Sequence, residues 1–123
     1  AHWSSGKSKL AEEHLITIAR DFSETPAGRY KPDGPFTGQH FRDDILIPSL
    51  QKFPQVTIDL DGVAGLPSSF WEESMGGLVR NGFKEEDLRK KLVMITTDPD
   101  LQVYIPLAWK FIREAELHSK ANH

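Results

Sequence analysis

The fold of this chain is decided by one stretch, VTIDLDGVAGLPSSFWEE, at residues 56–73. Apolar and polar side chains alternate at its start, which predicts a buried strand over residues 55–60. A glycine-containing turn comes next, and the pair Ser68 and Ser69 then stands directly before an expected helix. A strand, a turn and a helix N-terminus in this order are a natural place for a functional site in an α/β protein.

The composition of the chain limits the class of protein. The chain has 123 residues, of which 38% are hydrophobic and 27% charged, as is typical of one globular domain. The formal net charge of -3 argues against a general nucleic-acid-binding surface. There is no cysteine, which excludes thiol catalysis, disulfides and thiolate metal sites.

The ends of the chain and its hydropathy bear on location. No apolar run approaches the roughly 18 residues that a membrane span needs. Residues 1–9 lack the apolar core of an export signal, and we expect a flexible lead there with Trp3 as its one anchor. We expect residues 10–118 to form the domain and residues 119–123 a flexible tail. These features favour a cytoplasmic protein with neither a nucleic acid nor a membrane as partner.

The first half of the domain predicts a strand, a long loop and a helix. Alternation over residues 14–22 predicts the strand. Residues 23–38 are rich in proline and glycine, which predicts a loop without regular elements, and loops of this length are often functional. Thr37 is a suitable N-cap for a helix whose apolar stripe runs through residues 41–50. Pro48 interrupts the stripe and is expected to kink or end this helix.

The second half predicts two helices and a strand before the last helix. The helix after Ser69 carries Gly76 and Gly77 in its middle, each of which should cost roughly 1 kcal/mol relative to alanine. We therefore expect the helix backbone to approach another element closely there. A short charged helix over residues 84–91 and a buried strand over residues 92–96 follow.

The last helix has two alternative starts. Asp98 as a cap and Pro99 at the first helical position predict a start there, with an apolar stripe that continues to Ala115. Pro106 conflicts with that stripe. Either the helix kinks at Pro106, which we favour, or residues 102–105 form a short strand and the helix begins at Pro106. Strands that alternate with helices predict an α/β fold with a small central β-sheet and helices packed against it.

Four short motifs resemble those of a known family. They are Arg-Asp-Phe-Ser at residues 20–23, Gly-Arg at 28–29, Gly-x-x-Phe-Arg at 38–42 and Ser-Ser-Phe at 68–70. Their order resembles the STAS-like domains of uncharacterised prokaryotic proteins, over about residues 16–115. Residues 56–79 also resemble the STAS domains of bacterial anti-sigma-factor antagonists, in which a serine pair begins a helix with small residues in its middle. The resemblance implies a STAS-like fold.

The resemblance also implies a function. It implies a non-enzymatic module that binds another protein, without a cofactor and without catalytic or metal-binding residues. In the antagonists, a partner kinase phosphorylates the first serine of the pair and thereby switches binding off. Ser68 is the matching position, and the implied partner is a regulatory protein such as a kinase-like ATPase. A phosphate there would meet free N–H groups and the positive end of the helix dipole.

The resemblance has one departure, and the serine pair has a second interpretation. The antagonists have an aspartate before the pair, where this chain has Pro67. Ser69 and Glu72 also fit a Ser-x-x-Glu capping box, which is a purely structural role.

We expect a regulatory or partner-binding surface around the serine pair. Its expected members are Ser68, Ser69, Asp59, Asp61 and Trp71. The apolar, glycine-containing helix after Ser69 also offers an interface for a homodimer.

The basic loop suggests a second function, the binding of an anion or nucleotide-type ligand. Arg29 and Arg42 would contact the ligand near Thr37 and Gly38, at the start of the first helix. An ordered surface loop with solvated charges is the simpler interpretation of the same residues.

A third function follows from the aspartates in the opening stretch. Asp59-Leu60-Asp61-Gly62-Val63 resembles the first motif of Mg-dependent haloacid-dehalogenase-type phosphatases, whose first aspartate is the nucleophile and whose second is the acid/base. The sequence has no later acidic pair of the kind that completes the metal site in those enzymes. Turn chemistry at a strand end also explains Asp59 and Asp61.

Overall fold

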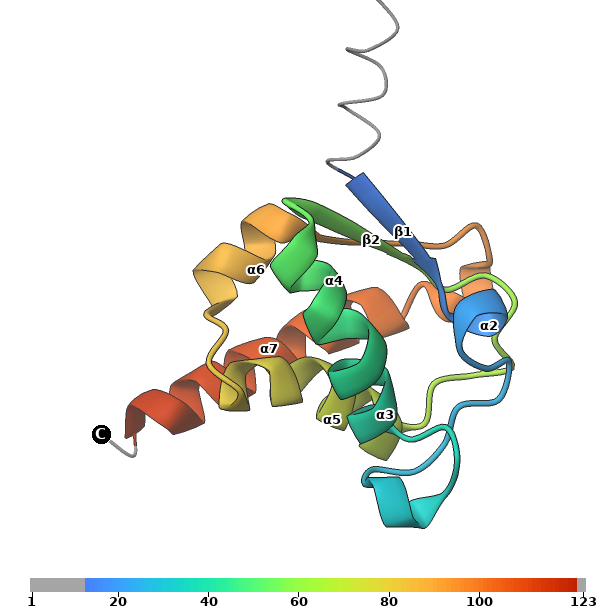
Figure 1. The fold of residues 1–123 in the computed structure, drawn as a ribbon, viewed down its shortest axis with the longest axis horizontal. Coiled ribbons are helices and arrows are strands. Elements are labelled where there is room, and N and C mark those ends of the chain that lie inside the picture. Colours follow the sequence, from blue (N-terminus) through green and yellow to red (C-terminus); the bar gives the residue numbers. More distant parts are fainter. Residues whose placement is uncertain (1–12, 122–123) are drawn as a thin grey trace, which may run out of the picture.

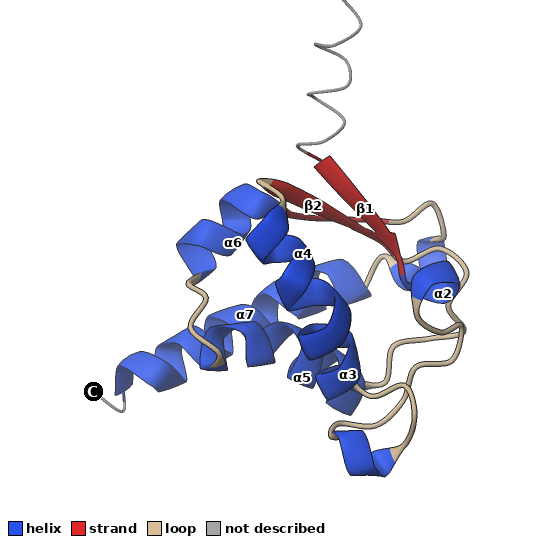
Figure 2. Cartoon of the chain, in the orientation of Figure 1, coloured by secondary structure: helices blue, strands red, loops and turns tan. Residues whose placement is uncertain are grey.

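The computed structural model describes residues 13–121, which form two layers (Figure 1). One layer is a parallel sheet with the strand order β1 (Glu13–Thr17), β2 (Gln55–Asp59) and β3 (Leu92–Ile95). The main helices lie together on one side of this sheet (Figure 2). They are α3 (Gly38–His40), α4 (Ile47–Lys52), α5 (Ser68–Arg80), α6 (Glu85–Lys91) and α7 (Tyr104–Ala121). This arrangement confirms the predicted α/β fold.

The core lies between the sheet and the helices. Ile16, Ile58 and Met94 stand side by side in the register of the three strands and are buried on the helix side. Phe70 and Trp71, both fully buried, come from α5, which packs chiefly against α7. Burial of each large apolar side chain stabilises the fold by about 1.5–3 kcal/mol, so the sheet and α5 are held by the same core.

The first strand is shorter than the predicted residues 14–22. It ends at Thr17, and the short helix α2 (Ile18–Asp21) follows. The Asp21 carboxylate accepts a hydrogen bond from the Thr17 N–H (2.8 Å), which turns the chain out of the sheet. Ile18 is buried in α2, and the predicted strand also placed it in the core. Apolar alternation therefore did not mark the change from strand to helix.

The predicted kink at Pro48 takes the form of a π-helical segment, η2 (Phe41–Leu46), between α3 and α4. Proline has no N–H, and its ring crowds the carbonyl four residues earlier. Here the turns before Pro48 are wide, and the Ile47 N–H bonds to the Arg42 carbonyl five residues back. The helix therefore does not end at Pro48 but continues to Lys52.

The last helix starts at neither of the two predicted positions. Asp98 caps a separate 3₁₀ turn, η3 (Pro99–Leu101), and α7 begins at Tyr104. Pro106 lies in the first turn of α7, where a backbone N–H has no acceptor within the helix, so no kink is needed.

The loop and the chain ends also differ from expectation. The 23–38 loop contains one 3₁₀ turn, η1 (Lys31–Asp33), where no regular element was predicted. Residues 119–121, predicted as part of a flexible tail, belong to α7, which extends to Ala121, and the Lys120 ammonium pairs with Glu116 one turn earlier (3.6 Å). The predicted N-terminal lead with Trp3 lies outside the described residues.

Candidate functional site

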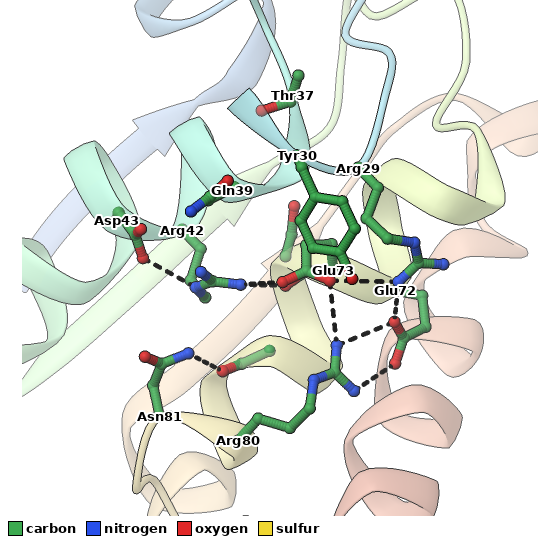
Figure 3. A network of polar contacts seen from close by, with 12 residues as sticks. Arg29, Tyr30, Thr37, Gln39, Arg42, Asp43, Glu72, Glu73, Arg80 and Asn81 are labelled. Carbon is green, nitrogen blue, oxygen red and sulfur yellow. Dashed lines mark hydrogen bonds and ion pairs between the residues drawn. The ribbon is translucent and has the colours of Figure 1, made fainter. Parts of the chain in front are cut away.

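An ion-pair network joins the 23–37 loop, η2 and α5 (Figure 3). At its centre the Arg42 guanidinium donates to the Glu73 carboxylate, and both side chains are more than nine-tenths buried. Arg29 donates to Glu72 (2.6 Å) and to Glu73 (3.2 Å). Arg80 closes the network with a bond to Glu72 (2.9 Å). The network thus fixes the loop against α5.

The arginine partners of Glu72 favour its ionised form. Burial alone would raise the pKa of Glu72, but hydrogen bonds from Arg80 and Arg29 outweigh burial and hold that pKa below its ordinary value. In turn, the hydrogen bond to Glu72 raises the pKa of Arg29. The Glu72–Arg29 pair is therefore charged at neutral pH.

Three glycines, Gly38, Gly76 and Gly77, make room for the network. A methyl group on Gly77 would lie 2.5 Å from the Arg42 guanidinium, and one on Gly38 would lie 2.5 Å from the Phe70 carbonyl oxygen. The predicted close approach of the helix backbone to another element occurs at Gly77, where the neighbour is the Arg42 side chain, but at Gly76 the neighbours are Glu72 and Arg80 of the same helix. The backbone approach occurs at Gly38, where α3 meets α5.

The predicted anion-binding residues of the loop come together in this network. Thr37 caps α3 as expected, since its hydroxyl accepts from the His40 N–H (3.2 Å). Thr37, Gly38 and Arg42 are buried, and Arg29 is one-third exposed and paired with glutamates. The positive charges of Arg29 and Arg42 thus pair with glutamates of the same chain rather than facing a ligand.

The serine pair opens α5 with Ser68 at the surface. Pro67 is the N-cap residue, Ser68 is the first helical residue and is exposed, and Ser69 is half-buried. The predicted capping box at Ser69 is wrong, because the helix starts two residues earlier than that box requires and Glu72 turns toward Arg29 instead. No side chain caps this helix start.

The predicted surface role of Trp71 is wrong as well. Its side chain is fully buried, and its indole N–H donates to the carbonyl oxygen of Tyr104 (2.8 Å). Trp71 therefore anchors the start of α5 to the start of α7.

A groove of about 410 Å³ lies beside the start of α5. Pro67 forms part of its wall, and Tyr104 contributes the largest side chain. The remaining lining comes from residues 25–27 and residues 64–66. The groove therefore connects the long loop, the β2–α5 turn and the start of α7 at the place where Ser68 is exposed.

The two aspartates of the opening stretch form a turn at the end of β2. Asp59 accepts a hydrogen bond from the Asp61 N–H (2.9 Å). Asp61 in turn accepts from the Thr96 hydroxyl (2.5 Å) and the Thr97 hydroxyl (2.7 Å), which follow β3. The hydrogen bond from Thr96 is the main reason why the pKa of Asp61 lies below its ordinary value. The interpretation of this pair as turn chemistry is thereby confirmed.

Glu72, Glu73 and Arg80 are the network residues that sequence reasoning missed. One signal was present, since Glu72 and Glu73 precede Gly76 and Gly77 by four residues each and so share their faces of the helix. Because glycine has no side chain, a carboxylate beside it leaves room for a long basic side chain to approach. The partner, Arg42, is 31 residues away in the chain, beyond the reach of a local pattern.

Residues 37–102, more than half of the chain, match the family model described as a STAS-like domain of unknown function (DUF4325). The chain belongs to this family, which confirms the predicted STAS-like family and fold. The match includes α3, the aspartate turn, the serine pair and α5. The chain matches no curated protein and no solved structure.

Two classes of feature are absent from the described part of the chain. Among residues 13–121, no three side chains of the types that ligate metals converge on one point. None of the helices within those residues combines the length and the apolar character that a membrane crossing requires.

Proposed function

We propose that the chain is a non-enzymatic regulatory module that acts in the cytoplasm by binding another protein, and that phosphorylation of Ser68 switches this binding. The STAS-like family supports an interaction role in general terms. The observation that carries the proposal is the position of Ser68, exposed in the first turn of a 13-residue helix that has no capping side chain.

The start of α5 suits a phosphate for electrostatic reasons. Within residues 13–121, no protein acceptor bonds to the N–H groups of Ser68, Ser69 or Phe70, whereas the Trp71 N–H bonds to Pro67. Free N–H groups and the positive end of the helix dipole both favour an anion there. The same phosphate would add about two negative charges to the surface, which is enough to repel a partner that docks on the unmodified form.

The groove beside Ser68 supplies the proposed contact surface. Its wall combines small residues, prolines and the Tyr104 ring, so a partner segment gains apolar contact close to the switch residue. The proposed partner is a regulatory protein of the kinase-like ATPase kind, which would both dock here and phosphorylate Ser68.

Substitutions at Ser68 test the proposal. The partner is first isolated as the protein that co-purifies with the unmodified chain from its native host, and its affinity is then measured for three forms. Ser68→Asp should weaken binding at least about tenfold, a change of about 1.4 kcal/mol. Ser68→Asn, which has nearly the same size as Asp but no charge, should bind like the wild type. Equal affinity of the Asp and Asn variants would contradict the switch.

A further inference from the structure

The outer face of the sheet lies on the side away from the main helices (Figure 2). Side chains alternate between the two faces of a strand, so the neighbours of the buried residues point outward. Leu15, Val93 and Ile95 are outward-facing aliphatic side chains that are 46%, 38% and 44% exposed. The register aligns Leu15 and Val93 in one row through Thr57, and the next row contains Ile95. The face therefore carries three exposed aliphatic side chains on its two outer strands, with Thr57 and Asp59 of the central strand between them.

This surface is unusual for a parallel sheet. All-parallel sheets are covered on both faces in nearly all proteins, and their strands are accordingly apolar throughout. β3 has that character, since all four of its residues, Leu-Val-Met-Ile, are apolar. Two of those four side chains point away from the core. The strand thus has the composition of a doubly covered strand, while the described part of the chain covers only one of its faces.

Charge indicates what kind of group would cover the face. Asp59 belongs to the same row as Ile95 and points outward. Its carboxylate accepts the Asp61 N–H, and within residues 13–121 it forms no ion pair with a cation. Arg20 interacts electrostatically with Asp59, but its ion pair is with Asp21 (3.0 Å). A covering group must therefore bring its own positive charge to this end of the face.

A second copy of the chain does not meet that requirement. Two such faces packed together would bury two Asp59 carboxylates, and the face itself offers no cation to pair with them. Burial of an unpaired charge costs several kcal/mol, which opposes this dimer.

We propose that the outer sheet face docks an amphipathic helix of a partner protein. The aliphatic stripe of that helix lies on Leu15, Val93 and Ile95, and a lysine or arginine beside the stripe pairs with Asp59. This surface is separate from the start of α5, because α5 lies in the helix layer on the other side of the sheet (Figure 1). The module therefore has two contact surfaces, one next to Ser68 and one on the sheet.

Synthetic peptides test this docking surface directly. The probe is an amphipathic helix of about 18 leucine and lysine residues, and its control replaces every lysine with glutamate. Each peptide is titrated into the isotope-labelled full chain, and amide chemical shifts are recorded by NMR. We expect the leucine–lysine peptide to shift amides of β1 and β3 around Leu15, Val93 and Ile95. The leucine–glutamate peptide should bind at least about tenfold more weakly.

Matched variants distinguish peptide binding at the sheet face from general electrostatic attraction between the peptide and the protein. Ile95→Glu should weaken binding of the leucine–lysine peptide at least about tenfold. Asp59→Asn should reduce the ratio of the affinities for the leucine–lysine and the leucine–glutamate peptides. Leu117→Glu is the control, because Leu117 is 57% exposed on α7 and so can be replaced without disturbing the core. The Leu117→Glu variant should bind the leucine–lysine peptide with the wild-type affinity. The amide spectrum of each variant without peptide checks that it is folded.

Three results would overturn the proposal. The first is that peptide shifts map outside the sheet face. The second is that Ile95→Glu and Leu117→Glu have the same effect. The third is that the free chain is a dimer by light scattering and becomes a monomer on Ile95→Glu, which would make a second copy the occupant.

Discussion

Arg42 joins η2 to α5. Its guanidinium is buried, and it contacts the Glu73 carboxylate and the Asp43 carboxylate (2.9 Å). Removal of one partner from a buried ion pair typically costs about 3–5 kcal/mol, because the other charge is left without compensation. Glu73 would retain Arg29 as a second partner (3.2 Å), which places the expected loss at the lower end of that range.

We therefore expect Arg42→Met to lower the free energy of unfolding by about 3 kcal/mol. Urea denaturation followed by circular dichroism measures the change. Lys31→Met is the matched control, because the Lys31–Asp44 pair is 3.8 Å long and exposed, and its loss should cost less than about 1 kcal/mol. Similar losses for the two variants would show that the buried network does not carry the stability assigned to it.

Gly38 offers a second test at the residue scale. A methyl group there would meet the Phe70 carbonyl at 2.5 Å and the Glu73 Cβ at 2.8 Å, so α3 and α5 would have to separate. We expect Gly38→Ala to destabilise the fold by about 1–3 kcal/mol in the same denaturation experiment. Gly34→Ala is the control, since nothing lies within 4 Å of its position and its backbone is extended. If both variants matched the wild type, the close packing of α3 on α5 would be wrong.

At the scale of elements, α5 combines an uncapped start with the proposed switch. An acidic side chain in the first turn of a helix is stabilised by about 0.3–1 kcal/mol, and salt screens the effect. We expect Ser68→Asp to raise the free energy of unfolding by about 0.5 kcal/mol at low salt and by less at high salt. Ser119→Asp, in the last turn of α7, should have the opposite sign. An equal effect of both variants would contradict the dipole argument.

The elements differ in how well the sequence predicts them, and the reasons are physical. β2, β3 and α6 lie within about one residue of their predicted bounds and the start of α5 within two, because polar or breaking residues flank each apolar pattern. The start of α7 could not be predicted in the same way. A proline is tolerated in a first turn and harmful in later ones, so the pattern around Pro106 fitted several starts.

The candidate site was predictable only in part. The serine pair and the aspartate turn are local in sequence and were identified from it. The network around Arg42 and Glu73 joins residues 31 positions apart, and the same arginine was interpreted as a ligand contact because its partner was unknown. The burial of Trp71 is a further tertiary effect, since its hydrogen-bond acceptor belongs to α7.

At the scale of the whole molecule, carboxylates paired with arginines link stability to pH. The hydrogen bond from Arg113 is the main cause of the lowered pKa of Glu85. The pKa of Glu72 is also lowered, since its arginine hydrogen bonds outweigh the opposing effect of burial. A carboxyl group with a lowered folded-state pKa stabilises the fold above its unfolded-state pKa, and that stabilisation is lost as the pH falls through the folded-state value.

We therefore expect the free energy of unfolding to decrease on acidification below about pH 4.5. Glu72→Gln should be less stable than the wild type at pH 7, and the difference between them should shrink toward pH 3, because falling pH increasingly protonates the wild-type carboxylate. Glu114→Gln, at an exposed position of α7, is the control and should follow the wild-type curve. A Glu72→Gln deficit that is the same at both pH values would contradict the linkage.

The described chain is thus a two-layer STAS-like domain, and Ser68, the proposed switch residue, lies at the surface of its helix layer. Its central claim is that phosphate on Ser68 controls binding to a partner. The most direct measurement is quantitative mass spectrometry of the protein from its native host, after partner-bound and free pools have been separated. The account predicts phosphate on Ser68 in the free pool and an unmodified serine in the bound pool. Equal phosphate in the two pools, or none under any growth condition, would contradict it.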